Sequence, residues 1–281
     1  MPAPDRMLRT IQQAAHICRQ TPGRVGRCVT LTDCTELLIS GDIHGNLPLL
    51  RQLIAQADLG RHPTRHVVVQ ELVHGPHRYP QGGDKSHQLV DVVAAWINQY
   101  PGRVHYLLGN HELAQWTERK IVKNDEEMTS SFAQGVRHAY GTHAEPIYES
   151  YLRLFAALPI ALRTPNGGWL SHSLPNARQL GELSLAKLEV AEHAPDDLLP
   201  GGIVYAMTWG RDTAAEHVEQ FLQRVAADWL ITGHIAQPTG YARPSARHII
   251  LDSMHSPGAI CQIPTTQPLD GDAIEAAIRL V

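Results

Sequence analysis

At residues 40–46 the sequence reads Ser40-Gly41-Asp42-Ile43-His44-Gly45-Asn46, directly after the apolar run Leu37-Leu38-Ile39. A short apolar run that ends in glycine and polar residues is typical of a buried strand with functional side chains at its C-terminal end. Side chains two residues apart in a strand point the same way, so Asp42 and His44 can bind one cation if the chain stays extended through Ile43. The alternative is a strand-to-helix turn in which Asp42 only caps a helix that starts near Asn46.

The same pattern occurs three more times along the chain. Apolar runs at 103–108, 169–170 and 229–232 lead into Gly109-Asn110-His111-Glu112, Ser171-His172 and Gly233-His234. Four such strands would bring histidine, aspartate and asparagine side chains together along one edge of a sheet. The recurrence therefore favours a metal site over a simple helix cap.

The order Gly-Asp-x-His-Gly, Gly-Asn-His-Glu, a lone histidine after a strand and then Gly-His resembles the calcineurin-like metallophosphoesterases. Within them it looks most like the phosphoprotein phosphatase branch, which includes serine/threonine phosphatases and diadenosine tetraphosphatase-like relatives. The resemblance covers roughly residues 35–265. It implies an α/β fold in which a two-sheet mixed β-sandwich is flanked by helices, with the site at strand C-terminal ends on one edge.

The hydrophobic pattern predicts elements that suit this fold. Apolar spacing predicts helices at 5–20, 47–59, 86–100, 148–158 and 214–226, and strands at 35–40, 67–69, 103–108, 169–172, 229–232, 248–252 and 259–263. Apolar runs on both sides of the turn 165–168 predict a β-hairpin. We expect residues 1–34 to be an N-terminal helical extension packed on the core and residues 35–281 to be the metallophosphoesterase domain. Residues 113–150, charged and polar, are expected to form a surface excursion beside the site.

The second motif of the family is the one that this chain changes most. After the strand at 67–69 the sequence is Gln70-Glu71-Leu72-Val73-His74-Gly75-Pro76, where the family has Gly-Asp-x-x-Asp-Arg-Gly. By position Glu71 replaces the aspartate that bridges two metal ions, and its longer side chain can still bridge if the backbone is set back. Two alignments remain open for the rest of the motif. Either His74 stands at the second aspartate, or Asp84-Lys85-Ser86, after the insertion 76–83, replaces Asp-Arg-Gly.

We prefer the second alignment, which makes Asp84 the carboxylate that orients the catalytic imidazole and Lys85 a cation on the substrate phosphate. Lysine offers one flexible charge where arginine offers a planar fork, so the exchange is not neutral. The alternative for both residues is a solvated helix start. Arg211 follows Trp209 and precedes a helix, as the phosphate-binding arginine of the family does. A salt bridge at the helix start is its alternative role.

The resemblance also assigns the catalytic and metal-binding residues. His111 would be the general acid that protonates the leaving group. Metal one would be held by Asp42, His44 and Glu71, and metal two by Glu71, Asn110, His172 and His234. The family has His-Gly-Gly where this chain has His172-Ser173-Leu174, so the ligand is kept and the loop shape is not.

Two divalent ions about 3.5–4 Å apart lower the pKa of water toward ~7, so a dimetal-activated hydroxide is the expected nucleophile. The mixed oxygen and nitrogen ligands favour Mn²⁺, with iron or zinc as alternatives. The expected function is hydrolysis of a phosphomonoester, including phosphoserine or phosphothreonine, with a phosphorylated protein or small molecule as substrate. Two alternatives are a dinucleoside polyphosphate hydrolase, which needs a nucleoside pocket, and a non-catalytic pseudo-phosphatase that binds metal or a phosphorylated partner.

Composition agrees with an ordinary enzyme. The chain has 281 residues, 43% of them hydrophobic, and a net charge of -4, which argues against nucleic acid or an anionic membrane as the main partner. The N-terminus lacks a signal-peptide pattern and no run approaches 20 apolar residues, so we expect a cytoplasmic protein.

Overall fold

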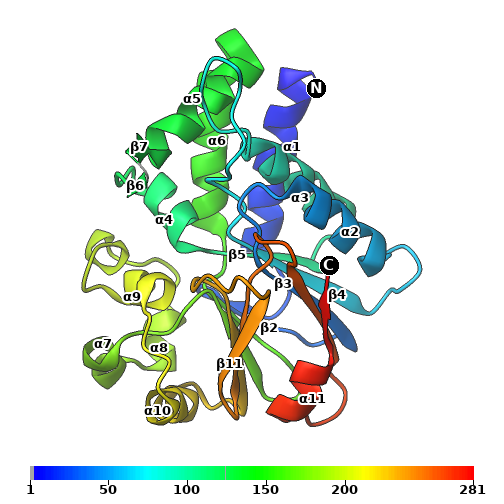
Figure 1. Cartoon of the computed structure of the whole chain (residues 1–281). Helices are drawn as coiled ribbons and strands as arrows, with labels where there is room; N and C mark the ends of the chain where they lie inside the picture. The colour runs from blue at the N-terminus through cyan, green and yellow to red at the C-terminus, as the bar shows by residue number, and fades with distance from the viewer. Residues whose placement is uncertain (1–2, 124) are drawn as a thin grey trace.

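Two mixed β-sheets pack face to face in the computed structural model, which describes residues 3–123 and 125–281 (Figure 1). The larger sheet has the strand order β1 (Arg24–Val25), β2 (Cys28–Thr30), β8 (Ala161–Arg163), β9 (Gly168–Ser171), β10 (Trp229–Thr232), β12 (His248–Leu251), β11 (Tyr241–Ser245). The smaller sheet has the order β14 (Ile278–Leu280), β13 (Ala259–Pro264), β3 (Glu36–Asp42), β4 (Arg65–Gln70), β5 (Val104–Leu107). A separate hairpin pairs β6 (Val122–Lys123) with β7 (Glu126–Glu127). The predicted two-sheet α/β fold is confirmed.

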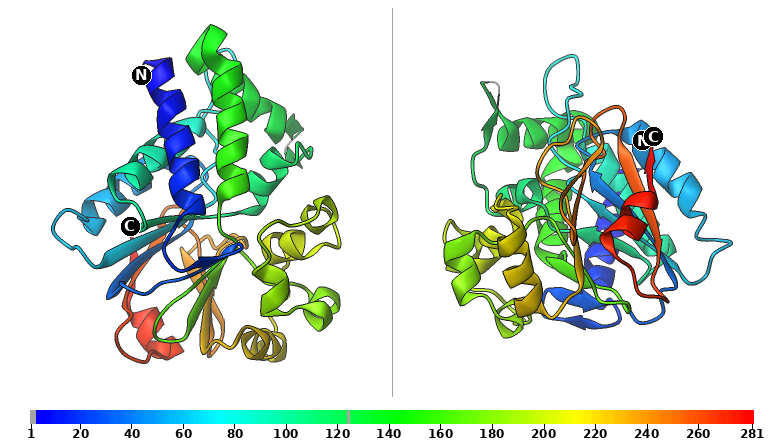
Figure 2. Two further views of the ribbon diagram at one scale, coloured as in Figure 1. Left: turned by 180° about the vertical axis from the view of Figure 1, so that it is seen from behind. Right: turned by 60° about the horizontal axis from the view of Figure 1, so that its bottom comes forward.

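Helices cover the outer faces of both sheets (Figures 1 and 2). On the side of the smaller sheet they are α1 (Pro4–Arg19), α2 (Leu47–Ala57), α3 (His87–Gln99), α4 (Asn110–Trp116), α5 (Met128–Tyr140), η1 (Gly141–His143) and α6 (Ala144–Ala157). The remaining ones are α7 (Ala177–Glu182), α8 (Leu185–Leu188), η2 (Pro195–Leu198), α9 (Ile203–Trp209), α10 (Ala215–Val225) and α11 (Gly271–Ala276). Among the described residues, no helix combines the length and the apolar character needed to cross a membrane.

Successive side chains of these strands point alternately into two different cores, and both cores are apolar. For this reason the strands are continuous apolar runs in the sequence. In β3, Leu37 and Ile39 belong to the core between the two sheets, while Leu38 belongs to the core beneath the helices. In β10, Ile231 belongs to the core between the two sheets, and Leu230 belongs to the core beneath the helices. Each strand is thus buried on both faces, and each such side chain contributes about 1.5–3 kcal/mol by burial.

The first 34 residues take part in both the core and a sheet. The apolar face of α1 is buried against α3 and α6, with Ile11 fully buried, and Figure 2 shows α1 and α6 side by side. The strand β2 pairs in parallel with β8, and β1 forms the edge of the larger sheet.

Residues 113–150 are not the surface excursion expected from their charge. Their helices α5 and α6 contribute Phe132, Val136 and Ile147 to the main core, where all three are fully or almost fully buried. The apolar residues of α5 recur every four positions and therefore form one stripe, while the polar residues occupy its other face.

Two buried histidines in the smaller sheet contact each other. His66 of β4 and His105 of β5 share a hydrogen bond of 3.0 Å between Nδ1 and Nε2. Burial lowers the pKa of His66 to about 4 and that of His105 to about 3. In the unfolded chain the pKa is about 6.5, so below that pH the unfolded state binds more protons and stability falls as the pH drops.

We therefore expect the free energy of unfolding to decrease by roughly 2 kcal/mol per histidine between about pH 6.5 and 5. Urea unfolding at several pH values, compared with His105→Leu, measures this contribution. The variant should show a flatter pH dependence than the parent protein. An unchanged slope would show that His105 does not titrate between the two states.

Candidate metal centre

Five strands from both sheets deliver the predicted ligands to one place. Strands β3, β4 and β5 of the smaller sheet end at or just before Asp42, Glu71 and Asn110, and β9 and β10 of the larger sheet lead into His172 and His234. The expectation of a single sheet edge was therefore wrong. The carboxyl ends of both sheets meet because Asp42 forms a β-bridge with Asp252, which follows β12.

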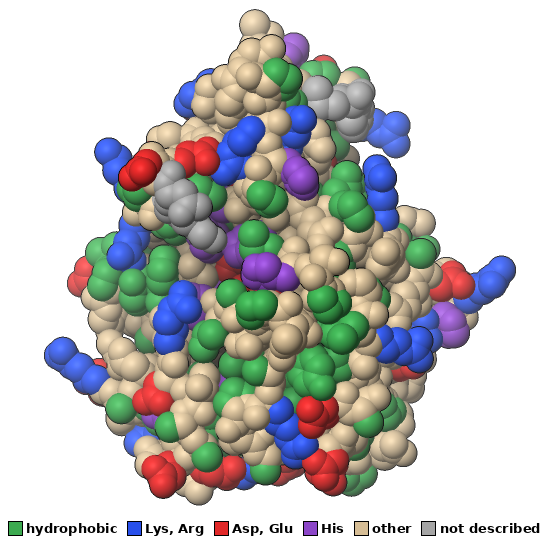
Figure 3. Space-filling view, viewed as in Figure 1, with side chains coloured by type: hydrophobic (Ala, Val, Ile, Leu, Met, Phe, Trp, Pro, Cys, Tyr) green, Lys and Arg blue, Asp and Glu red, His purple; other side chains and the backbone are tan. Residues whose placement is uncertain are grey.

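The two sheets approach closely at this point, and glycine makes the approach possible. A Cβ on Gly41 would lie 2.1 Å from the carbonyl oxygen of Leu251, and one on Gly233 would lie 2.1 Å from Oδ1 of Asp42. Figure 3 shows histidine side chains reaching the surface near the middle of this face, between the helical half of the molecule and the strands.

Asp42 is held by the backbone of the neighbouring strand end. The backbone N–H of His234 donates to both of its carboxylate oxygens, at 3.0 and 2.9 Å. Burial raises the pKa of Asp42 to about 7; the His172 ring opposes this shift and the charge of Glu71 adds to it. A bound cation would reverse this penalty, because it favours the charged carboxylate.

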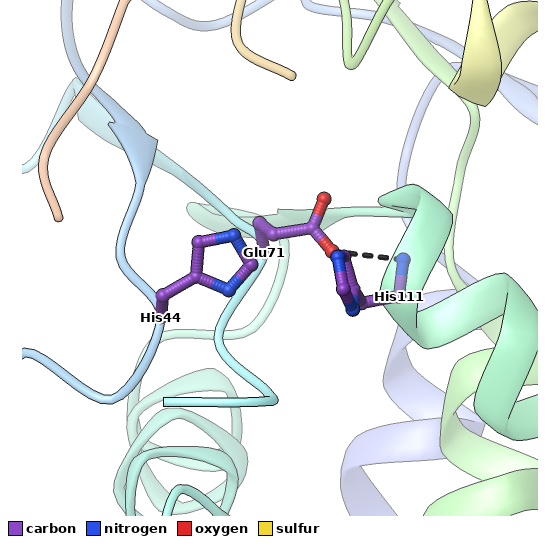
Figure 4. Close-up of side chains that lie close together, drawn as sticks. All are labelled: His44, Glu71 and His111. Carbon is purple, nitrogen blue, oxygen red and sulfur yellow. Dashed lines mark hydrogen bonds between the residues drawn. The ribbon is translucent and has the colours of Figure 1, made fainter. Parts of the chain in front are cut away.

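Glu71 lies at the centre of the candidate site (Figure 4). Strand β4 ends at Gln70, and Glu71 has a φ of 49°, so the backbone turns away while the carboxylate points into the site. Its Oε1 accepts a hydrogen bond from the backbone N–H of His111 at 2.8 Å. A Cβ on Gly109 would lie 2.7 Å from its Oε2, so the glycine leaves room for the longer side chain.

Glu71 belongs to both groups of side chains that could hold a metal ion. One group is His44, Glu71 and His111, and the other is Asp42, Glu71 and His172; within each group the ligand atoms lie within 4.8 Å of one another. Asp42 and His44, expected to share one cation, thus fall in different groups. The chain is not extended there, because His44 has a φ of 41°.

The turn after His44 leads into α2, and the residue that caps this helix is Asn46. Its Oδ1 accepts a hydrogen bond from the backbone N–H of Leu49 at 3.1 Å. Asp42 is therefore not a helix cap, and the alternative role considered for it is wrong.

The tautomer of His172 follows from its neighbour Gln70. The Nε2 of Gln70 donates to the carbonyl oxygen of Ser40 at 3.1 Å, so its Oε1 is the atom that faces His172 Nδ1, at 2.8 Å. His172 must donate from Nδ1, which leaves a lone pair on its Nε2. That nitrogen lies 2.6 Å from Oε2 of Glu71 and 2.8 Å from Oδ1 of Asn110.

Asn110 and His234 complete the cluster. Oδ1 of Asn110 lies 2.9 Å from Nδ1 of His234, whose Nε2 is buried and has no hydrogen-bond partner among the described residues. Burial lowers the pKa of His172, and burial and the neighbouring His172 lower the pKa of His234 to about 2. Neutral imidazoles are the form that binds metals.

The cluster fits divalent cations. Nε2 of His172 lies at short distance from both Oδ1 of Asn110 and Oε2 of Glu71, so three atoms that can act as acceptors converge there. Such an arrangement of buried acceptors is stabilised by positive charge, and imidazole, amide and carboxylate ligands are those of transition-metal sites.

Backbone strain is concentrated at the same place. Of the eight non-glycine residues with positive φ in the described part of the chain, four are His44, Glu71, His74 and His234, with φ between 41 and 67°. Each such residue costs about 1–3 kcal/mol and persists where the surroundings hold it, which is common at functional sites.

Two histidine rings contact His111: that of His74, with 2.5 Å between their Nδ1 atoms, and that of His44, with 5.1 Å between ring centroids. Asp84 instead accepts hydrogen bonds from the backbone N–H and the hydroxyl of Ser86, at 2.8 and 2.7 Å, and faces Arg78. The hydroxyl of Ser86 accepts from the backbone N–H of His74 at 3.0 Å. Asp84, which follows the insertion, thus supports the loop that carries His74, whereas His74 itself contacts the His111 ring. The geometry therefore favours the alignment with His74 at the second aspartate.

The two predicted phosphate-binding cations lie in different surroundings. The Lys85 ammonium lies over the ring of Tyr79, 5.1 Å from its centroid, and thus contacts a side chain of the insertion 76–83. Arg211 is exposed in the loop between α9 and α10, and its charge is one cause, after burial, of the lowered pKa of His172 and His234. Arg211 therefore lies within electrostatic reach of the cluster.

Sequence reasoning gave no role to Gln70, Glu112 or Gln115. Glu112 is fully buried, and its Oε1 accepts hydrogen bonds from the backbone N–H groups of Leu72 and Val73 and from the hydroxyl of Tyr106. Burial and the charge of Glu71 raise the pKa of Glu112 to about 8. Its place in Gly109-Asn110-His111-Glu112 was the available signal, whereas nothing local marked the two glutamines.

Comparison with solved structures supports the fold assignment. A serine/threonine phosphatase from Saccharomyces cerevisiae, described as similar to human phosphatase PP5, superposes with a TM-score of 0.72 at 15% identity, over 100% of this chain and 89% of that chain. A cold-active protein-tyrosine phosphatase from a psychrophilic Shewanella species gives a TM-score of 0.60 at 14% identity, over 93% of this chain and 84% of its own. None of the curated proteins compared with the chain matches it.

The family assignment rests on the sequence. The model of the calcineurin-like phosphoesterase family matches residues 35–238, which begin at β3 and extend beyond His234. This segment contains every candidate ligand and makes up most of the chain. The chain therefore belongs to the calcineurin-like phosphoesterase family and is a hydrolase that acts on phosphoester bonds.

Proposed function

We propose that the protein hydrolyses a phosphomonoester at a centre of two divalent cations. The observation that carries this proposal is the position of Glu71, which is common to both candidate ligand groups. A carboxylate shared in this way suits a bridge between two ions, as in other two-metal hydrolases.

The residues divide between the two ions as the family resemblance implies. The resemblance assigns Asp42, His44 and Glu71 to one ion, and Glu71, Asn110, His172 and His234 to the other. In the structure Asp42 and His44 each form a group with Glu71, but not the same group, so the shared carboxylate is the part of this division that the geometry supports. Bound ions would polarise the phosphoryl group and activate the attacking water. The mixed ligand set favours Mn²⁺, with iron or zinc as alternatives.

The chain's own residues would bind the phosphate and move the proton. Arg211 is exposed, its charge acts on His172 and His234, and it would bind two phosphoryl oxygens through its planar guanidinium. His111 lies at the start of α4, where its backbone N–H donates to Glu71. Its ring would protonate the leaving alkoxide.

A substrate panel tests the reaction class. p-Nitrophenyl phosphate, phosphoserine and phosphothreonine peptides, and diadenosine tetraphosphate would each be assayed with and without Mn²⁺. We expect metal-dependent release of phosphate from the monoesters. Turnover of diadenosine tetraphosphate alone would favour the dinucleoside polyphosphate reading, and metal binding without any turnover would favour a pseudo-phosphatase.

Metal content tests the ligand assignment directly. We expect His172→Ala and His234→Ala each to lower the bound metal from about two ions per chain toward one, because each removes a ligand of the same site. Elemental analysis of dialysed protein measures this. His248→Ala, which removes another buried histidine, is the control for folding. Unchanged stoichiometry in both ligand variants would contradict the assignment.

A further inference from the structure

A row of hydrogen bonds extends from His111 into the helical part of the molecule. Nδ1 of His111 lies 2.5 Å from Nδ1 of His74, and Nε2 of His74 lies 3.0 Å from Oε1 of Gln115. Both His74 and Gln115 are buried, Gln115 completely. His111 and Gln115 lie on the same helix, α4, and His74 lies against both.

The amide of Gln115 can adopt only one orientation. Its Nε2 lies 3.3 Å from the backbone carbonyl oxygen of Thr129 and 2.6 Å from the hydroxyl of Tyr148. A carbonyl oxygen only accepts hydrogen bonds, so the atom facing Thr129 must be the NH₂ group. The amide oxygen is therefore the atom that faces His74.

This orientation determines the proton positions along the row. Since Oε1 of Gln115 only accepts, His74 donates from Nε2, and its Nδ1 carries a lone pair when the ring is neutral. Burial lowers the pKa of His74 to about 4, so the ring is neutral at physiological pH. The contact between the two Nδ1 atoms then needs a proton on His111.

We propose that Gln115 and His74 are positioning residues that hold His111 in the tautomer with its proton on Nδ1. This inference rests on the proposed role of His111 and adds the device that orients it. When the imidazolium of His111 gives its Nε2 proton to the leaving alkoxide, the ring is left neutral with its remaining proton on Nδ1, which is the tautomer that His74 stabilises. A neutral imidazole thus occupies the position at which the family has a carboxylate.

The loop that carries His74 is itself fixed. His74 has a φ of 61°, its backbone N–H donates to Ser86, and the preceding backbone N–H groups donate to Glu112. The ring, bonded at both nitrogens, has no alternative position that keeps both contacts. Rotating it by 180° would place a carbon against Gln115.

Nitrogen NMR of the metal-free protein tests the tautomers without any activity. Histidine labelled with ¹⁵N, observed at about pH 8, shows which ring nitrogen carries the proton. We expect a proton on Nε2 of His74 and on Nδ1 of His111, with signals assigned from His74→Leu and His111→Ala. The opposite tautomer at either ring in the parent protein would overturn the proposal, whatever the substrate proves to be.

Two substitutions of Gln115 separate positioning from simple packing. Both Gln115→Leu and Gln115→Glu lose the donor to Thr129, but only glutamate keeps an acceptor for His74. We expect the His74 and His111 rings to become mixtures of tautomers in Gln115→Leu. In Gln115→Glu both rings should keep the tautomers of the parent protein. If the two variants behave alike, Gln115 only supports packing and the proposal fails. His74→Asp, which keeps an acceptor for His111, should retain the His111 tautomer, and its loss there would overturn the proposal as well.

Kinetics give the second readout. We expect Gln115→Leu to lower kcat by at least about tenfold for a poor leaving group with little change in KM, since a catalytic histidine in the wrong tautomer loses much of its effect. Gln115→Glu should recover most of this loss. Gln220→Glu on α10 is the matched control, because Gln220 is exposed. A loss confined to KM would contradict a positioning role.

Discussion

We expect His111→Ala to lower kcat for an alkyl phosphomonoester by about 10²–10⁴, the usual contribution of a general acid. The loss should shrink for p-nitrophenyl phosphate, whose leaving group needs little protonation. Steady-state kinetics with substrates of graded leaving-group pKa measures both effects. Folding and metal content, measured on the same samples, are expected to match those of the parent protein.

Metal content matters for this variant because His111 also lies in a group with His44 and Glu71 that could hold an ion. If His111→Ala lost metal, the residue would be a ligand and not an acid. Equal relative losses for good and poor leaving groups would also contradict proton donation. The leaving-group dependence therefore separates the two roles of the same side chain.

Glu71 should show the largest effect on metal binding. We expect Glu71→Gln, which removes the negative charge between two cations, to weaken metal binding by more than the roughly 10–100-fold typical of an outer-shell partner. Glu71→Asp should weaken it less. The backbone of Glu71, with a φ of 49°, turns away from the site, and Gly109 leaves space for the long side chain. The shorter side chain of aspartate would therefore not reach the ions.

Metal titration and Mn²⁺-dependent turnover of both variants distinguish a fitted glutamate from a decayed aspartate. A rise in activity with Glu71→Asp would mean that glutamate is the weaker residue here. No effect from either change would mean that Glu71 is not a ligand. The exposed Glu145→Gln is a control for loss of one negative charge.

The fold could be predicted from the sequence because its signals are local. Apolar runs such as Leu37-Leu38-Ile39 are buried on both faces, and each is followed at once by polar residues. A strand end and the side chain after it are fixed together by the backbone. For this reason the sequence alone places Asp42, Asn110, His172 and His234 at or just after strand ends.

The partner of His111 could not be found in this way. His74 and Asp84 lie 37 and 27 positions before it in the chain, and both are polar residues beside the same insertion. The choice between them depends on how the loop after β4 packs against α4, which the hydroxyl of Ser86 and the carboxylate of Glu112 determine. The charged composition of 113–150 predicts a surface segment wrongly for a similar reason. Burial of α5 depends on one stripe of apolar side chains and not on the average polarity of the segment.

The sequence by itself determined the family, the two-sheet fold and the strand ends that carry the candidate ligands, because periodicity and short motifs act within a few residues. Only the tertiary structure decided that both sheets contribute to the candidate site, that Gln70 faces His172, and that His111, His74 and Gln115 form one row of hydrogen bonds. These contacts join residues far apart in the chain. Their hydrogen-bond directions exist only after the helices and sheets have packed, so no local pattern encodes them.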